Sequence, residues 1–380
     1  MKLERKVEIA DYQRRSDGRF PVPKPYVTVL LDTYNHEAFI EKAITSVLQQ
    51  DFPESETEIL VVDDGSSDRT PDIVEKFAPR VRLLRKSNGG QASAFNAGIP
   101  EAQGEIVAFL DGDDWSAQNK LSAVAGVFEV EPAVGLVGHG VTQVSSDNGY
   151  RTEIPREVCR FRIHSVAQAK TFRMLRGFFG TSRMAYRRKI LHEIGPVPKT
   201  LRFEADEYVF TLAALLIDVV ILNQPLTYYR LHEGNLFQIA GRNEAKIQNK
   251  QRILEALADT LEAKMKAIGV SEEIAGTLLE TVRIEADILR LLVESGFPWE
   301  TIATELKIMR VFHSDASLWQ HLFSYARLLP ALVMPSASYY RWRHRISRSG
   351  LYKDLRQRFL PFPVPRHVER QEKSAPPGKL

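Results

Sequence analysis

Three apolar runs of the chain each end in a polar loop that is followed by a helical pattern. The runs cover residues 27–31, 58–62 and 105–110, and the first is followed by apolar residues at helical spacing over 36–50. Strand, loop and helix in repetition predict an α/β fold, with a mostly parallel central sheet flanked by helices. Because ligands bind outside the carboxyl ends of such strands, the three loops should meet at one site.

The loop after residues 105–110 is strongly acidic. It places Asp111, Asp113 and Asp114 within four residues. Like charges this close repel one another, so a folded protein keeps them together where a cation or strong hydrogen-bond donors compensate. Carboxylates suit Mg²⁺ or Mn²⁺. The alternative is an acidic turn that caps a helix beginning near Ser116. A second acidic strand end, Asp63-Asp64, favours the metal site.

The composition indicates a globular protein of ordinary type. The 380 residues are 44% hydrophobic and 26% charged, enough for one large core or two smaller ones. The single cysteine, Cys159, excludes an intrachain disulfide framework and fits a reducing compartment. Residues 1–25 lack a signal-peptide pattern, and the apolar stretch 209–222 is shorter than the roughly 20 residues of a membrane span. We therefore expect a cytoplasmic protein.

The pattern divides the chain into four parts. Residues 1–25 are expected to be a leader, 26–235 the α/β domain, 236–360 a helical C-terminal region and 361–380 a proline-rich disordered tail. Within the domain, residues 151–180 are rich in arginine and weakly patterned, which predicts a mobile segment over the site.

Several motifs in the same order resemble those of the family 2 glycosyltransferases, which are inverting enzymes with the GT-A fold. The matching segments are Thr33-Tyr34-Asn35, residues 62–70, Asn88-Gly89-Gly90, residues 110–114, residues 181–188, residues 204–207 and residues 228–232. The resemblance covers about 27–235. There are two departures: Asp32 stands where a proline is usual, and Arg183 stands where a small residue is frequent.

The resemblance implies a site for a nucleotide-diphosphate sugar. Tyr34 would stack on the base, and Asp63 or Asp64, with Asp64 slightly favoured, would accept a hydrogen bond from it. The alternative is that either acid caps the next helix. The residues implied in nucleotide binding are Thr33, Tyr34, Asn35, Asp63, Asp64, Asn88, Gly89, Gly90, Asp111, Arg230 and His232.

The resemblance also implies a metal ion and a catalytic base. Asp113, with Asp111, would hold Mn²⁺ or Mg²⁺ at the diphosphate, and Arg230 and His232 would neutralise that group as it leaves. Inversion needs one carboxylate to deprotonate the acceptor hydroxyl. Asp206 is the expected base and Glu207 the alternate. Both also fit a helix N-terminus, where acids are favoured without any catalytic role.

The C-terminal region has a basic aromatic segment. Residues 339–345 interleave Tyr, Trp and Arg, and the preceding 322–334 are apolar. This composition is typical of a segment lying on an anionic membrane, although a solvated basic helix fits equally well. Nucleic acid is a third candidate partner for such a segment, and we do not expect it. The expected location is therefore cytoplasmic, at or near the inner face of a membrane.

The expected function is transfer of one sugar from a nucleotide sugar, UDP-linked by preference, to a hydroxyl on a glycan or lipid-linked acceptor in bacterial surface-glycan assembly. A non-catalytic nucleotide-sugar-binding module is the alternative. A processive polysaccharide synthase is less favoured because Ser338 stands where the Gln-x-x-Arg-Trp signature begins and no membrane span flanks it. A dinucleotide-dependent oxidoreductase is disfavoured because no Gly-x-Gly-x-x-Gly follows the first strand.

Overall fold

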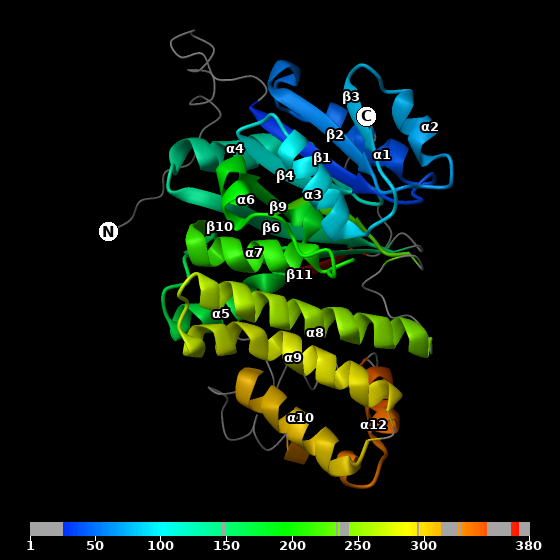
Figure 1. Ribbon diagram of the computed structural model, residues 1–380, viewed down its shortest axis with the longest axis vertical. Coiled ribbons are helices and arrows are strands. Elements are labelled where there is room, and N and C mark those ends of the chain that lie inside the picture. Colours follow the sequence, from blue (N-terminus) through cyan, green and yellow to red (C-terminus); the bar gives the residue numbers. More distant parts are fainter. Residues whose placement is uncertain are drawn as a thin grey trace. The chain divides into compact units, whose positions relative to one another are not determined.

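A computed structural model describes most of the chain in two compact units (Figure 1). The described residues are 26–145, 149–232, 235, 243–294, 296–312, 325–326, 328–347 and 366–371. Unit 1 takes its described residues from 1–162, 177–232 and 367–380, and unit 2 from 163–176 and 233–366. The expected leader, 1–25, and most of the expected tail, 361–380, lie outside the described residues.

Four parallel strands form one half of the sheet in unit 1. Their order is β3-β2-β1-β4. Their bounds are β1 (Val27–Thr33), β2 (Thr57–Asp63), β3 (Val81–Arg85) and β4 (Ile106–Asp111). β1 is central, and its Asp32 is in register with Val62 of β2 and Asp111 of β4. The three acidic or polar strand ends therefore share one edge, as the sequence predicts.

The other half of the sheet is mixed in direction. β9 runs antiparallel to both β4 and β6, while β10 is parallel to β6 and antiparallel to β5 and β8. β7 pairs with β6 and neighbours β11. The bounds are β5 (Trp115–Ser116), β6 (Val134–Val144), β7 (Tyr150–Pro155), β8 (Cys159–Phe161), β9 (Met184–Arg187), β10 (Asp218–Arg230) and β11 (Arg366–Gln371). The α/β class is confirmed, and the parallel order that the sequence predicts holds in the first half of the sheet.

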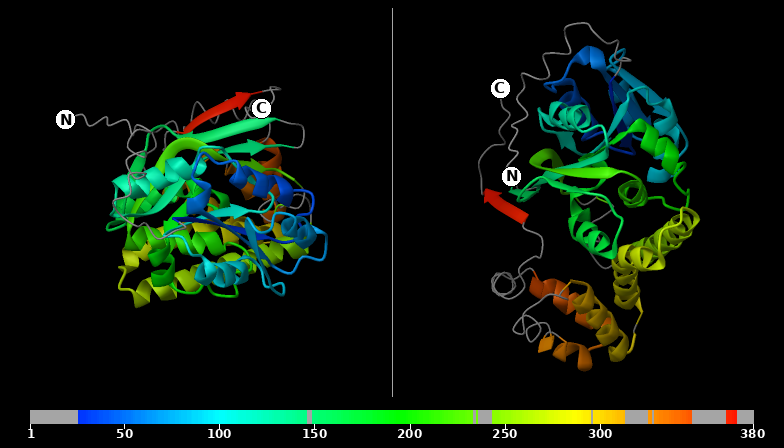
Figure 2. Two further views of the ribbon diagram at one scale, coloured as in Figure 1. Left: turned by 90° about the horizontal axis from the view of Figure 1, so that it is seen from above. Right: turned by 90° about the vertical axis from the view of Figure 1, so that its left-hand side faces the viewer.

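Helices cover both faces of this sheet (Figure 2). One face packs against α1 (Ile40–Leu48), α2 (Thr70–Glu75) and α4 (Lys120–Val130), whose apolar residues form one core with the strands. The other face carries α3 (Gln91–Glu101), α6 (Arg188–Ile194) and α7 (Ala205–Leu216).

Side-chain alternation along β1 decides which face each residue meets. Leu31 packs in the core beneath α1 and α4, whereas Leu30 lies against Gly98 of α3, where an added Cβ would come within 2.8 Å of it. Asp32 follows Leu30 with period two, and Asp111 follows Phe109, whose ring contacts Phe95 of α3 at a centroid distance of 4.8 Å. Asp32 and Asp111 therefore emerge together on the α3 face.

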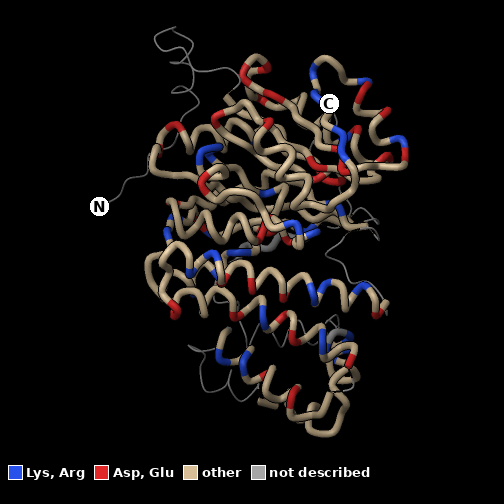
Figure 3. The backbone as a smooth tube through the Cα atoms, viewed as in Figure 1, with Lys and Arg blue, Asp and Glu red and all other residues tan. Residues whose placement is uncertain are grey.

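Unit 2 is helical. Its elements are α5 (Val166–Leu175), α8 (Glu244–Ala267), α9 (Glu272–Val293), α10 (Pro298–Phe312), the 3₁₀ turn η6 (Leu329–Leu332) and α12 (Ser336–Ser347). Both α8 and α9 carry acidic and basic residues along their length (Figure 3). No helix in the described part of the chain is both long enough and apolar enough to cross a membrane.

The arginine-rich stretch 151–180 differs from its prediction. Instead of a weakly structured segment, it contains β7, β8 and α5. α5 packs on α9 in unit 2, where Arg173 forms an ion pair with Glu280 at 3.1 Å. Arg173 thus has a structural partner far along the chain, which a local pattern does not reveal.

Candidate functional site

An acidic cluster lies at the carboxyl edge of β1 and β4. It consists of Asp32, Asp111, Asp113 and Asp114. Carboxylate oxygens of the last three lie within 4.8 Å of one another, an arrangement able to hold a metal ion. Buried oxygens Oδ1 of Asp32 and Oδ2 of Asp114 have no hydrogen-bond partner in the described structure. Unpaired buried carboxylate oxygens are costly, so the cluster suits a cation or a bound donor.

The crowding of these carboxylates shifts their pKa values. Burial, together with the charge of Asp113, raises the pKa of Asp32 and that of Asp114 to about 8. Burial and then Asp32 raise the pKa of Asp111 well above its usual value. Asp113 behaves differently: burial opposes its ionisation, but the hydrogen bond from His232 and the nearby His36 lower its pKa. Asp113 is therefore the member that most readily carries the negative charge.

Residues at the end of β10 hold the acidic loop. Nε2 of His232 donates to Oδ2 of Asp113 at 2.9 Å. The backbone N–H of Arg230 donates to Asp114 at 3.0 Å, and its Nε donates to the carbonyl oxygen of Asp113 at 3.0 Å. Arg230 and His232, two residues with a predicted role at the diphosphate, thus both contact the loop that carries Asp113.

A short 3₁₀ turn, η5 (Thr181–Arg183), connects the acidic cluster with Asp206. The N–H of Thr181 donates to Oδ2 of Asp206 at 3.1 Å. The next residue, Ser182, accepts at its Oγ from the N–H of Asp111 at 2.9 Å. Two consecutive residues therefore position a carboxylate on α7 and a carboxylate at the end of β4.

Asp206 is a buried carboxylate at the start of α7. Its side chain also accepts from the N–H of Glu207 at 2.9 Å, which is the helix-start contact that the sequence suggested as an alternative role. Burial raises the pKa of Asp206, although its hydrogen bonds and Arg183 act in the opposite direction. Glu207, the alternate base, is partly buried. Asp206 therefore makes both contacts at once, one with Glu207 at the helix start and one with Thr181 of η5.

The loop after β1 is fixed to the loop after β2. Asn35, in the left-handed region at φ 55°, accepts from the N–H of Ser67 at 2.8 Å, and its own N–H donates to Oγ of Ser66 at 2.8 Å. Tyr34, the residue before Asn35, is 45% exposed, whereas Thr33 is buried. The loop therefore exposes one aromatic ring beside a backbone that is hydrogen-bonded to the loop after β2.

Asp63 and Asp64 do not cap the helix that follows them. The first N–H of α2, that of Thr70, instead donates to Oδ1 of Asp68. Asp63 accepts from the N–H of Ser66 and from Arg85. The capping alternative for the Asp63-Asp64 pair is therefore wrong.

Asp64 instead contacts the loop after β3, which contains Asn88, Gly89 and Gly90. It accepts from the N–H of Gly89 at 3.1 Å and from that of Gly90 at 2.7 Å, and Lys86 also contacts it. Gly90 has φ 82°, a conformation that glycine adopts without strain. Asn88 accepts from Arg202 at 2.6 Å. The nucleotide-binding residues predicted from three separate loops thus form one connected set of contacts.

Sequence reasoning missed two residues that hold the site together. Lys120 is 1% exposed, and its ammonium donates to the carbonyl oxygens of Phe109 at 3.2 Å and Ser182 at 2.9 Å. Burial lowers the pKa of Lys120 to about 7, against the attraction of nearby carboxylates. Gln91 donates to Oγ1 of Thr181 at 2.8 Å and accepts from the N–H of Ala205. Both look like ordinary helix residues in the sequence.

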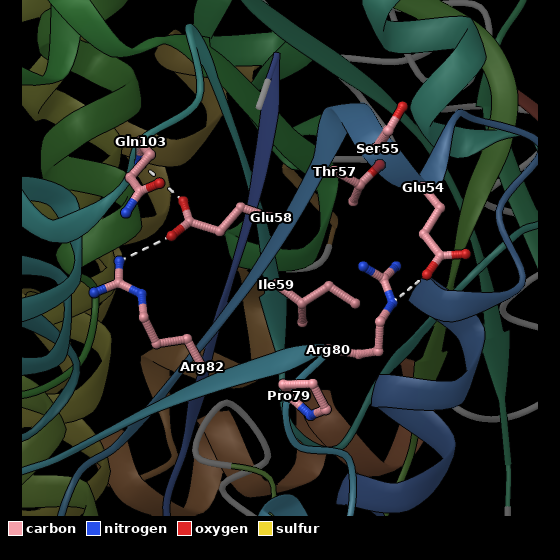
Figure 4. Close-up of a pocket in the computed structure, with 9 residues that line it drawn as sticks. All are labelled: Glu54, Ser55, Thr57, Glu58, Ile59, Pro79, Arg80, Arg82 and Gln103. Carbon is pink, nitrogen blue, oxygen red and sulfur yellow. Dashed lines mark hydrogen bonds and ion pairs between the residues drawn. The ribbon is translucent and has the colours of Figure 1, made fainter. Parts of the chain in front are cut away.

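A pocket lies at the opposite end of β2 and β3. It includes Glu58, Arg82 and Gln103, and ion pairs and hydrogen bonds join these residues (Figure 4). Its residues come from the beginnings of the two strands, whereas the acidic cluster follows strand ends. This pocket is therefore separate from the candidate site.

The comparison with protein families identifies the α/β part of the chain. Residues 28–195 match the model of glycosyl transferase family 2. A protein from Nostoc named as an uncharacterized glycosyltransferase is 33% identical over 223 residues, which is 55% of this chain and 66% of the relative. The uncharacterized glycosyltransferase EpsJ of Bacillus subtilis is 32% identical over 225 residues, which is 57% of this chain and 64% of the relative. The chain spans just under two thirds of the length of these two relatives.

A solved structure shares the fold. Crystals of residues 1–349 of TarS from Staphylococcus aureus in complex with UDP-GlcNAc match with a TM-score of 0.51 and 19% identity, over 83% of this chain and 92% of that one. TarS is named a poly(ribitol-phosphate) beta-N-acetylglucosaminyltransferase, and its sequence is 35% identical over 127 residues, covering 30% of this chain and 22% of TarS. Residues 28–195 of the chain therefore match the family 2 glycosyltransferases, and the fold of the chain is GT-A.

Proposed function

We propose that this protein transfers a sugar from a nucleotide-diphosphate sugar to a hydroxyl acceptor with inversion at the anomeric carbon. One observation carries the proposal: η5 joins the acidic cluster to a single buried carboxylate, Asp206, through Thr181 and Ser182. An inverting displacement needs one site for the leaving diphosphate and one base on the acceptor side. The acidic cluster would serve the first task, and Asp206, with Glu207 as the alternate, would serve the second.

The nucleoside would bind along the loops after β1 and β2. Tyr34 is exposed and its backbone neighbours are fixed, so its ring is available to stack on a base. Asp64 is the better candidate of the acidic pair for the base, because its side chain keeps 6% exposure and that of Asp63 has none. Asn88, Gly89 and Gly90 would then lie beside the ribose and phosphates.

The acidic cluster fits Mg²⁺ or Mn²⁺, because it offers hard oxygen ligands and has buried oxygens without partners. Asp113 would be the first ligand, since it ionises most readily, with Asp111 beside it. A bound divalent ion would supply positive charge to the leaving nucleoside diphosphate. Arg230 and His232 would add positive charge on the same side.

Asp206 would accept the proton of the acceptor hydroxyl. Its raised pKa makes it a stronger base than an ordinary aspartate, and its contacts with Thr181 and Glu207 fix its orientation. Glu207 stays the alternate because it occupies the same first turn of α7.

The finer assignments are a UDP-linked donor and an acceptor in surface-glycan assembly. They are supported by the name of the relative TarS and by the nucleotide sugar in its crystals. A lipid-linked or glycan acceptor is consistent with work at the inner face of a membrane, where the basic C-terminal segment would attach the protein. Transfer of single residues is proposed, rather than processive synthesis.

The experiment is a donor screen with the purified full chain. UDP-, GDP- and dTDP-sugars are each tested with Mn²⁺ for thermal stabilisation and for slow hydrolysis to free sugar and nucleoside diphosphate. One donor class should stabilise the protein and be hydrolysed, and Asp113→Asn should abolish hydrolysis. Binding without hydrolysis or transfer would favour a non-catalytic binding module, and no binding at all would contradict the proposal.

A further inference from the structure

One end of unit 2 exposes large apolar side chains. These residues, which we call the apolar tip, are Phe297, Trp299, Leu329, Leu332 and Val333, with exposed fractions of 69%, 65%, 64%, 58% and 82%. They belong to the turn between α9 and α10, the start of α10, and η6 with the residue after it (Figure 1). Single exposed apolar residues are common on proteins, but a group of five at one place marks an interaction site.

Hydrogen bonds at Ser336 show that these segments are neighbours. The first residue of α12, Ser336, donates from Oγ to the carbonyl oxygen of Gly296 at 3.0 Å. Thr301 of α10 in turn donates to Oγ of Ser336 at 2.7 Å. The turn that carries Phe297 is thereby tied to the chain three residues after Val333. The two segments that carry the five exposed side chains of the apolar tip therefore lie next to each other.

The exposure of the apolar tip is a consequence of how η6 is anchored. Ala331, in the middle of η6, is fully buried in a small core with Leu291 of α9 and with Tyr339 and Tyr340 of α12. Leu332 and Val333, the two residues after Ala331, are exposed and so lie outside that core. The sequence assigned Tyr339 and Tyr340 to a membrane-facing segment, whereas the structure uses both as core residues.

The helix that follows the apolar tip in the chain, α12, carries exposed positive charge. Arg341 and Arg345 are exposed and lie four residues apart on α12, which places them on one side of that helix. Arg343 is occupied by Glu305. Described residues 325–326 and 328–347 contain no aspartate or glutamate. The nearest acids of the α9–α10 turn, Glu294 and Glu300, both pair with Arg290.

We propose that the apolar tip inserts into the headgroup region of an anionic membrane, with Arg341 and Arg345 at lipid phosphates. Exposed aromatic and aliphatic side chains flanked by arginines are the chemistry of such an interface. A second copy of the chain fits less well, because a symmetric contact of this surface with itself would bring these arginines together. The inference deepens the proposed function, since it names the surface that would bring the enzyme to a lipid-linked acceptor.

The test is co-sedimentation of the full chain with vesicles. Vesicles of phosphatidylcholine alone are compared with vesicles containing about one third phosphatidylglycerol, a composition chosen to give a strongly negative surface. The protein should bind the anionic vesicles preferentially. Leu332→Asp/Val333→Asp should abolish this binding, and Arg341→Gln/Arg345→Gln should weaken it about 25-fold, since each arginine near such a surface contributes roughly fivefold.

The matched control is Ile268→Asp, which adds a charge at an exposed apolar residue after α8, outside the apolar tip. It should bind vesicles like the wild type. Thermal stabilisation by nucleotide, measured for every variant without vesicles, shows that the fold is intact. Because it reports nucleotide binding and not membrane binding, it also separates this test from that of the proposed function. The proposal would be overturned if the wild type does not bind vesicles or binds both vesicle types equally. It would also be overturned if the Leu332/Val333 variant binds unchanged, or if the protein forms a dimer that this variant disrupts.

Discussion

The imidazole Nε2 of His232 lies 2.9 Å from the carboxylate Oδ2 of Asp113. The two residues are 119 positions apart, at the end of β10 and in the loop after β4. The hydrogen bond lowers the pKa of Asp113 while its neighbours Asp111 and Asp114 have raised values. One carboxylate of the acidic cluster is thus kept ionised, and it is the one best able to begin the capture of a cation.

Asp206→Asn should retain nucleotide-sugar binding but lower the rate of transfer about 10²- to 10⁴-fold, the usual contribution of a general base. Because burial raises the pKa of Asp206, wild-type transfer should also decline with falling pH at a higher pH than an ordinary aspartate would give. Rates measured across pH, with donor affinity measured separately, check both effects. If Glu207→Gln alone reproduces the loss, the base is Glu207.

Asp32→Asn should stabilise the metal-free protein at pH 8 relative to the wild type, but not at pH 5. The folded-state pKa of Asp32 is about 8 and the usual value is 3.8, so between these limits the folded state binds more protons than the unfolded state. Its contribution to the free energy of unfolding therefore falls as pH rises through this range. Measured in EDTA, the thermal midpoint of Asp32→Asn should exceed that of the wild type by a few degrees at pH 8 but not at pH 5. The exposed Asp72→Asn is the control. A gap that does not change with pH would refute the raised pKa.

Lys120→Met should lower the free energy of unfolding by about 1 to 3 kcal/mol for each carbonyl left without its donor. Met keeps an unbranched side chain as far as Cε, but the carbonyl oxygens of Phe109 and Ser182 lose the ammonium group. Denaturant unfolding measures the effect, and Lys76→Met, at an exposed lysine, is the control. Equal stability of the two variants would show that these buried contacts contribute little.

Tyr34→Ala should weaken binding of the nucleoside diphosphate roughly 5- to 150-fold, which corresponds to about 1 to 3 kcal/mol for one base–aromatic stack. Tyr34→Phe should bind like the wild type, because the ring and not the hydroxyl makes the contact. Isothermal titration with Mg²⁺ present compares the three proteins. Unchanged affinity of Tyr34→Ala would place the base elsewhere than on this loop.

The edge that carries the acidic cluster was predictable from the sequence because its causes are local. Apolar runs with β-branched residues form β1, β2 and β4, and parallel pairing brings their ends together without further information. The acids at Asp63, Asp111 and Asp113 are visible directly after those runs. Their placement follows from strand register alone.

Other features depend on partners distant in the chain. Lys120 looks like a surface helix residue until β4 and η5 place two carbonyl oxygens around its ammonium. α5 joins unit 2 because Arg173 pairs with Glu280, 107 residues later. Tyr339 and Tyr340 look like interfacial aromatics until α9 and η6 enclose them. The periodic pattern of apolar residues along the sequence does not reveal any of these contacts.

The central claim is that the acidic cluster holds a divalent cation on a nucleoside diphosphate, with Asp113 as a ligand. Anomalous scattering from Mn²⁺ in crystals grown with UDP tests it directly. The account predicts one strong peak within about 2.5 Å of a carboxylate oxygen of Asp113, beside the diphosphate. A diphosphate bound elsewhere, or a manganese peak away from Asp113 while the hydrogen bond from His232 stays in place, would contradict it.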